Sequence, residues 1–190
     1  MLLASPLRQG AQEAPAVDGP PLASFAAQRV AIVPVQLWRA DTVGWSRGAS
    51  WPELRSALDS VLGETLKERG LGTRWAYAAD VVRSARRNPM YAVDPYALGV
   101  GRWRNTPPKT GDRVPEVVAD NLRPITALGD TRYALIPVEL RGEGELAILR
   151  VILVDTRSRV IVWGGDFGVP GGAGAIDALA TRIADLIVEP

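Results

Sequence analysis

The sequence predicts an α/β (α+β) domain in which amphipathic helices flank a mixed, mainly antiparallel sheet. Three apolar segments, residues 131–142, 146–155 and 160–169, follow one another with only short polar turns between them. Strands joined by such short turns must run antiparallel, so these segments predict a C-terminal three-strand meander. Segments with apolar residues at three- and four-residue spacing lie before and after the meander and can cover it as helices. The chain of 190 residues is long enough to bury a sizeable core in one domain.

An N-terminal arm precedes the domain. Residues 1–27 are rich in Ala, Pro, Gly and Gln and show no sustained hydrophobic period, which predicts an extended or disordered arm. The start MLLAS resembles the end of the apolar region of a signal peptide, although no basic residue precedes it and the apolar run is short. A remnant of a signal peptide and an ordinary start therefore both stay open. Residues 28–190 are predicted to form a single α/β domain.

The first strand of the domain is predicted at residues 29–38, where β-branched residues are frequent. Pro34 interrupts this strand and has no backbone N–H to donate, so we expect a bulge or a free strand edge there. Residues 39–49 then form a loop.

The clearest helix spans residues 50–70. Ser50 and Glu53 form a capping box, and Pro52 stands in the first turn, where its missing N–H costs little. Gly70 can take the left-handed conformation that ends a helix. Five residues on one stripe would face the core: Leu54, Leu58, Val61, Leu62 and Leu66.

Two more helices are expected before the meander. They cover residues 79–88 and residues 115–129, and Pro124 should end or kink the second. A short strand precedes them at residues 73–78. Residues 89–113, between the two helices, are punctuated by Pro and Gly and predict a long irregular insertion.

The meander is expected to form the middle of the sheet. Pro137 lies inside its first strand, which predicts an edge position or a bulge. Residues 146–155 are apolar at nearly every position, as in a strand buried on both faces. We therefore expect the hairpin of residues 146–155 and 160–169 at the sheet's centre, with helices on both sides. A helix at residues 173–189 closes the chain, with an apolar stripe facing the core.

The composition excludes several kinds of chemistry. The chain has no cysteine and no histidine, which excludes thiol nucleophiles, disulfides, imidazole bases and the usual zinc sites. The formal net charge of +1 gives no general attraction to nucleic acid, so nucleic acid is an unfavoured partner. No apolar run reaches the ~18–20 residues of a membrane-spanning helix. We expect no transmembrane segment, cofactor or metal.

An enzyme or a nucleotide-binding domain is the alternative function. The glycine-rich residues 164–175 precede a helix, but the lysine of a phosphate-binding loop is missing, so a strand-to-helix connection is favoured. Asp155 stands at the start of a turn, where aspartate accepts turn N–H groups. Two sets of acidic residues could suggest a site, although turns and helix surfaces explain them. Carboxylate catalysis could use Asp155, Asp166, Asp177 and Asp185. A cation could be bound by Glu139, Glu143 and Glu145, for which a solvated turn is favoured.

Arginines alternate with aromatic residues in and before the irregular insertion. This composition is typical of protein-binding hot spots. Tyr and Trp would act as exposed anchors, and the arginines would bind acidic groups of the partner. A solvated loop with some aromatics in the core is the alternative. The predicted partner-binding residues are Arg86, Arg87, Tyr91, Tyr96, Arg102, Trp103 and Arg104, with Trp45 of the loop at residues 39–49 as a further anchor.

The strand motifs resemble those of a group of bacterial envelope domains. The opening strand AIVPV (31–35), the later YALIPVEL, and a hairpin whose turn starts at Asp155 and whose second strand contains Trp163 carry this likeness. The group includes the N-terminal domain of TolB, LpoB and CsgG, and the resemblance covers roughly residues 29–188. The chain lacks the lipid-attachment cysteine, the propeller repeats and the channel-forming hairpin found within this group.

The resemblance implies a domain that binds proteins rather than an enzyme. The function expected from it is a non-catalytic accessory module that docks onto a larger membrane-bound protein complex. A periplasmic or cell-envelope location, peripheral to the membrane, follows from the same resemblance, with the cytoplasm as the alternative.

Overall fold

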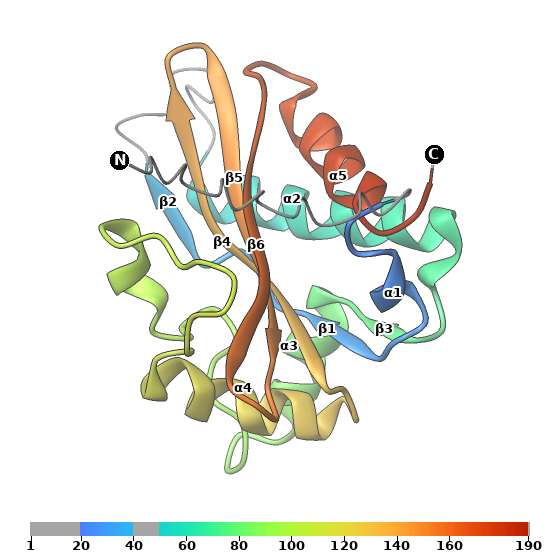
Figure 1. The fold of residues 1–190 in the computed structure, drawn as a ribbon, viewed down its shortest axis with the longest axis vertical. Coiled ribbons are helices and arrows are strands. Elements are labelled where there is room, and N and C mark those ends of the chain that lie inside the picture. Colours follow the sequence, from blue (N-terminus) through green and yellow to red (C-terminus); the bar gives the residue numbers. More distant parts are fainter. Residues whose placement is uncertain (1–19, 40–49, 190) are drawn as a thin grey trace, which may run out of the picture.

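The computed structural model describes residues 20–39 and 50–189. Its six strands form one mixed sheet in the order β3 (Trp75–Ala76), β1 (Val30–Ile32), β4 (Tyr133–Glu143), β5 (Leu146–Asp155) and β6 (Val160–Pro170). β2 (Leu37–Arg39) pairs with the far end of β4 (Figure 1). The pairs among β1, β2, β3 and β4 are parallel, whereas β4, β5 and β6 form the antiparallel meander. The predicted fold class is confirmed.

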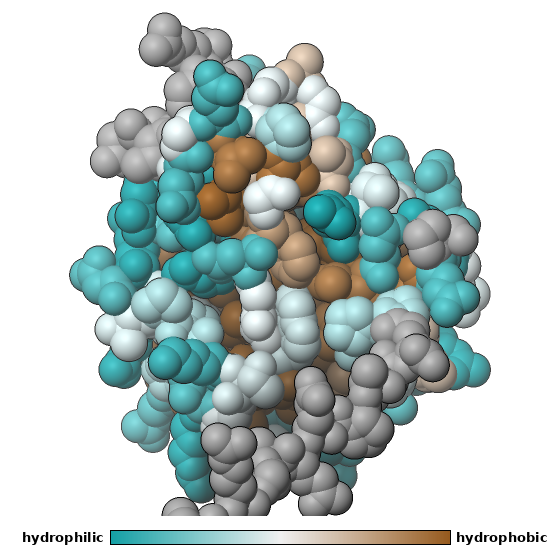
Figure 2. Space-filling model, turned by 45° about the horizontal axis from the view of Figure 1, so that its top comes forward, coloured by the Kyte–Doolittle hydropathy of each residue, from teal (hydrophilic) through white to brown (hydrophobic). Residues whose placement is uncertain are grey.

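Helices cover both faces of the sheet because each carries one apolar stripe. α2 (Trp51–Leu66) and α5 (Ala175–Asp185) pack with Leu135, Leu149 and Leu153 in one cluster. α3 (Ala78–Arg87), the 3-10 helix η4 (Val100–Arg104) and α4 (Glu116–Leu128) pack on the other face. The cluster there includes Ile136, Ile152 and Val154. Because side chains alternate along a strand, each long strand supplies residues to both clusters. On the face drawn in Figure 2, hydrophobic residues are visible in the middle and hydrophilic residues lie around them.

Local signals in the sequence set the ends of α2. The Glu53 carboxylate accepts a hydrogen bond from the Ser50 N–H at 2.8 Å, so the predicted capping box is present. This hydrogen bond lowers the pKa of Glu53. At the other end, a π-type segment, η3 (Lys67–Leu71), follows α2, and Gly70 takes the predicted left-handed conformation with φ 86°.

Prolines interrupt the two strands in which they were expected to do so. The segment that contains Pro34 separates β1 from β2, and β4 has a register shift between Pro137 and Glu139. β4 is nevertheless an inner strand. In α4, Pro124 does not end the helix, which continues to Leu128.

The hairpin expected at the centre of the sheet is central only in its first strand. β5 is buried from Ala147 to Asp155, with β4 on one side and β6 on the other. β6 is a partly buried edge strand, which corrects the prediction that both strands of the hairpin lie at the sheet's centre. Ile161 pairs outward with the segment around Asp112. Beyond it, no strand within the described ranges borders the outer edge of β6.

The predicted arm is too long at its C-terminal end. Leu22 is 2 % exposed, belongs to the core cluster around α2 and α5, and donates its N–H to the carbonyl of Leu186 at 2.7 Å. The short helix α1 (Ala23–Ala26) follows it. Residues 20–27 therefore belong to the folded domain, and residues 1–19 lie outside the described part of the chain.

Candidate partner-binding surface

Four of the predicted binding residues lie near one another around the C-terminal end of α3. The residues of this area, called the α3 surface below, are Arg83, Arg86, Arg87, Met90, Tyr91, Val93 and Tyr96. Two adjoining hollows of about 440 and 320 Å³ share Arg86 and Tyr96 in their linings. Because Val81, Val82 and Ala85 face the core, the helix turns its arginines outward.

The α3 surface combines unpaired positive charge with exposed apolar side chains. Arg83 forms an ion pair with Asp80 at 2.9 Å, but the exposed guanidinium groups of Arg86 and Arg87 have no partner among the described residues. Met90, the residue at the tip of the following turn, is 99 % exposed. Tyr91 is 60 % and Val93 38 % exposed. Such a mixture fits a partner that offers acidic groups beside apolar ones.

A column of stacked side chains supports the α3 surface at Tyr96. The Arg55 guanidinium lies 3.8 Å from the centre of the Tyr96 ring and 5.7 Å from that of Trp51. Trp51 in turn stacks on Trp38, with 5.5 Å between ring centroids. Cation–π contacts and stacking each restrict side-chain rotation, so Tyr96 is held in place before any partner binds. No local pattern in the sequence predicts this column, because its members come from β2, α2 and the insertion.

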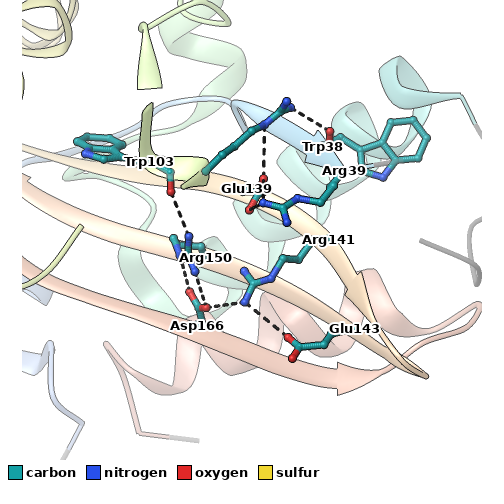
Figure 3. A network of polar contacts seen from close by, with 9 residues as sticks. Trp38, Arg39, Trp103, Glu139, Arg141, Glu143, Arg150 and Asp166 are labelled. Carbon is teal, nitrogen blue, oxygen red and sulfur yellow. Dashed lines mark hydrogen bonds and ion pairs between the residues drawn. The ribbon is translucent and has the colours of Figure 1, made fainter. Parts of the chain in front are cut away.

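Trp103 is a core residue, which corrects its predicted role as an exposed anchor. Its side chain is 4 % exposed and lies in the cluster on the α3–α4 face of the sheet. Its carbonyl accepts a hydrogen bond from Arg150 of β5 at 3.3 Å. Arg150 also binds Asp166 of β6 at 2.8 and 2.9 Å, and Arg141 joins the same carboxylate at 2.7 Å (Figure 3). This network attaches η4 to the sheet.

Arg104 also belongs to the scaffold, because its guanidinium binds other groups of this domain. Its Nη2 donates to the Trp38 carbonyl at 3.2 Å, and its Nε lies 3.6 Å from the Glu139 carboxylate. Glu139 is 1 % exposed and also pairs with Arg39 at 3.4 Å (Figure 3). The expectation that Glu139 belongs to a solvated turn is therefore wrong.

The other predicted residues are distributed differently. Arg102 is exposed on η4, apart from the hollows of the α3 surface. Trp45 lies outside the described residues, in the segment between Trp38 and Trp51. Arg86, Arg87, Tyr91 and Tyr96 therefore remain as the predicted residues that the structure brings together. Met90 and Val93 were missed because apolar residues in a predicted loop give no signal of exposure.

Two of the carboxylates considered for catalysis, Asp155 and Asp166, have structural partners. Asp155 accepts hydrogen bonds from the N–H groups of Arg157 and Ser158, as predicted for a turn, and binds Arg132 at 2.6 Å. Burial acts to raise the pKa of Asp155, but these hydrogen bonds outweigh it and lower the pKa. At Asp166, burial likewise acts to raise the pKa, but the hydrogen bonds and charges of Arg150 and Arg141 outweigh it and lower the pKa. Within the described ranges, no acidic cluster has the geometry to hold a metal ion.

The glycine-rich segment is mostly strand. β6 runs to Pro170, and α5 begins at Ala175, so only a short piece connects strand to helix. Gly165 leaves room for the Trp163 ring, because a Cβ there would lie 3.0 Å from it and the ring would have to shift. The Trp163 ring thus crosses Gly165 to stack on Phe167, with 5.8 Å between centroids. Packing of the edge strand explains Gly165 without a phosphate ligand.

Asp59 is the described acid with a pKa raised toward neutrality. Its carboxylate accepts a hydrogen bond from the Val35 N–H at 3.1 Å and lines a hollow of about 250 Å³. Burial raises its pKa to about 7, opposed by the Val35 hydrogen bond and by the Arg55 charge. Asp59 stands next to the cation that supports Tyr96, so it is a positioning group rather than part of the exposed surface.

No family model matches the chain, and no curated protein is similar to it in sequence. Among solved structures, it is similar to a PelC dodecamer from Paraburkholderia phytofirmans, with 16% identity over 90% of each chain and a TM-score of 0.41. The E. coli LpoB structure has 13% identity, covers 90% of this chain and 79% of that chain, and has a TM-score of 0.44. The LpoB C-terminal domain of Salmonella enterica has 14% identity, covers 75% of this chain and 83% of that chain, and has a TM-score of 0.43.

LpoB is thus present both in the resemblance seen in the sequence and among similar structures, whereas TolB and CsgG remain predictions. Identities and TM-scores this low transfer no function. Among the helices of residues 20–39 and 50–189, none has the length and apolar character needed to cross a bilayer.

Proposed function

We propose that the chain is a non-catalytic accessory module that docks, through the α3 surface, onto a larger membrane-bound protein complex. The observation that supports this function most strongly is the juxtaposition of two unpaired guanidinium groups, Arg86 and Arg87, with the exposed side chains of Met90 and Tyr91. Keeping such apolar side chains in water has a cost that contact with a partner removes.

The partner surface should carry carboxylates beside an apolar strip. Arginine binds carboxylates through two parallel hydrogen bonds, and these are strongest where the apolar residues around them exclude water. Tyr96 would form the rigid edge of the contact, because Arg55 already holds its ring. The cell-envelope location belongs to the same proposal and rests on the strand motifs that resemble envelope domains.

Site-specific crosslinking in native membranes tests the proposal. A photo-crosslinking residue at position 91 of the full chain should capture one protein, to be identified by mass spectrometry. The same residue at position 182, an exposed site on α5, should not capture it.

Charge reversal then tests whether the capture depends on the α3 surface. Arg86→Glu or Arg87→Glu should weaken binding of the captured protein by about tenfold or more, because like charges would then face each other. Arg182→Glu is the matched control and should bind normally. If Arg86→Glu, Arg87→Glu and Tyr91→Ala all bind the same protein normally, the α3 surface is not the docking site.

A further inference from the structure

A hollow of about 760 Å³ lies where the end of α4 meets the β5–β6 turn, and the α3 surface contributes no residue to it. Its charged lining residues come from four separate places in the chain, and all but one are arginines: Arg29, Arg123, Arg132, Arg157, Arg159 and Asp130. We refer to this place as the arginine hollow. Its volume lies within the range of about 300–1,000 Å³ that is typical of sites for small ligands.

The arginine hollow keeps an excess of positive charge after its ion pairs are counted. Asp130 pairs with Arg29, and Asp155 with Arg132 at 2.6 Å. Asp120 is shared, with Arg123 at 3.0 Å and Arg159 at 4.0 Å.

Arg157 supplies the charge that is left over. Its exposed guanidinium has no partner among the described residues. The carboxylates therefore leave Arg157 unpaired and Arg159 weakly paired, both on the β5–β6 turn.

Backbone strain is concentrated at the same place. The two non-glycine residues with positive φ in the described ranges are Asp130, at 48°, and Arg159, at 57°, and both line the arginine hollow. Aspartate tolerates this left-handed conformation, but arginine gains nothing from it, and glycine would adopt it without steric cost. A strained residue is maintained where its side chain has a use, and such residues cluster at ligand sites.

We propose that the arginine hollow binds a small, soluble, multivalent anion of the polyphosphate or polycarboxylate class. Guanidinium groups match the oxygen pairs of both classes, and several of them around one concave space favour a ligand with several charges. The apolar side chains of the lining are two alanines, Ala27 and Ala127. The hollow thus offers no large apolar group for a ring or for insertion into a bilayer, which favours a compact ion over a membrane surface.

Isothermal titration of the full chain with tripolyphosphate and with citrate tests this inference and shows which class is preferred. We expect one ion per chain, with affinity that falls as salt rises. Arg157→Ala should weaken binding by about tenfold, the loss of one hydrogen-bonded charge, whereas the matched surface variant Arg182→Ala should bind normally. Arg86→Glu should also bind the anion normally, so failure of the docking proposal would leave this one intact.

Arg159→Gly separates a ligand role from a structural one. If the strain serves binding, this variant should raise the thermal midpoint of the chain and weaken binding of the anion. A lower midpoint with unchanged anion binding would overturn the inference. So would binding that both Arg157→Ala and Arg159→Gly leave unchanged. Binding to vesicles with phosphatidylglycerol, without any binding of either soluble anion, would overturn it in favour of a membrane surface.

Discussion

At the scale of single residues, the charged side chain of Arg150 joins separate elements of the domain. The Arg150 side chain is 11 % exposed and forms two hydrogen bonds with Asp166 and one with the Trp103 carbonyl. A buried guanidinium without its carboxylate is costly, because neither water nor another group replaces the lost hydrogen bonds. The pair therefore couples η4, the inner strand β5 and the edge strand β6.

Replacing Asp166 by Ala should destabilise the domain by about 1–3 kcal/mol, since Arg150 loses its carboxylate and water replaces the 36 % exposed Asp166 side chain only in part. Urea denaturation measures this change. Asp177→Ala on the exposed surface of α5 is the control and should change the free energy of unfolding by less than about 0.5 kcal/mol. If Asp166→Ala lowers the free energy of unfolding no more than the control does, water replaces the Asp166 carboxylate as a partner of Arg150.

Asp59 should make stability fall as pH rises. Because its folded pKa, about 7, exceeds its usual value near 3.8, the folded state binds the proton more tightly than the unfolded state does. Its stabilising contribution is full below the unfolded pKa and is lost as pH rises through the folded pKa. Wild-type stability should therefore decrease between about pH 4 and 7 because of this group.

Asp59→Asn should remove that decrease, because the amide oxygen still accepts the Val35 hydrogen bond but carries no charge. We expect the variant to exceed the wild type by more than about 1 kcal/mol at pH 8, and by less at pH 4. Urea denaturation at both pH values measures this. Equal pH profiles for the two proteins would contradict a raised pKa at Asp59. The chain has no histidine, so no imidazole titration overlaps this range.

At the scale of elements, the strands of the meander differ in how well they are enclosed. β5 has a strand on each side and one of the two apolar clusters on each face. β6 pairs with β5 on one side, but its outer edge beyond Ile161 borders no described strand. The difference between the two strands lies in their neighbours, not in their length.

Hydrogen exchange should follow this difference. Amides of residues 147–154 should exchange slowest, at the rate of global unfolding, because opening them requires breaking both ladders. The outward-facing amides of residues 163–169 should exchange much faster. NMR-detected exchange measures both sets in one sample. Fast exchange across residues 147–154 would contradict an inner position of β5.

The sequence predicted those elements whose signal is local. The meander follows from the short turns at residues 144–145 and 156–159, and α2 follows from its capping box and leucine stripe. The edge position of β6 could not be predicted, because it depends on β1, β2 and β3 all lying on the β4 side of the sheet. Burial of Trp103 depends on an apolar cluster whose members, such as Ile136 and Ile152, lie far away in the sequence. The residues of the α3 surface were proposed only from arginines interleaved with aromatic residues, and this composition does not show which of the side chains are exposed.

At the scale of the whole molecule, the two ends of the described chain close the domain together. Leu22 packs among α2 and α5, and its backbone N–H binds the carbonyl of Leu186 just after α5. Phe25 adds an edge-to-face contact with Tyr133, the first residue of β4, at 5.0 Å between centroids. The N-terminal segment thus covers one end of the core from residue 20 onward.

Leu22→Ala should therefore destabilise the whole domain by about 2–4 kcal/mol, the usual cost of truncating a fully buried leucine. Thermal denaturation should show this as a lower midpoint of one cooperative transition. Truncating the partly exposed Leu146 to Ala is the control and should have a much smaller effect. An unchanged midpoint for Leu22→Ala would show that residues 20–27 belong to the N-terminal arm and not to the folded domain.

The parallel pairing of β1 with β4 also affects how the protein is made. Val30 pairs with Tyr133, so β1 leaves the ribosome long before its partner strand exists. At about 5–20 residues per second, this apolar strand waits roughly 5–20 s for β4 to be translated. Among the described strands, only the two-residue strand β3 can pair with β1 during this interval, so the other edge of this hydrophobic strand stays exposed. We therefore expect chaperones to bind near residues 30–35 during translation.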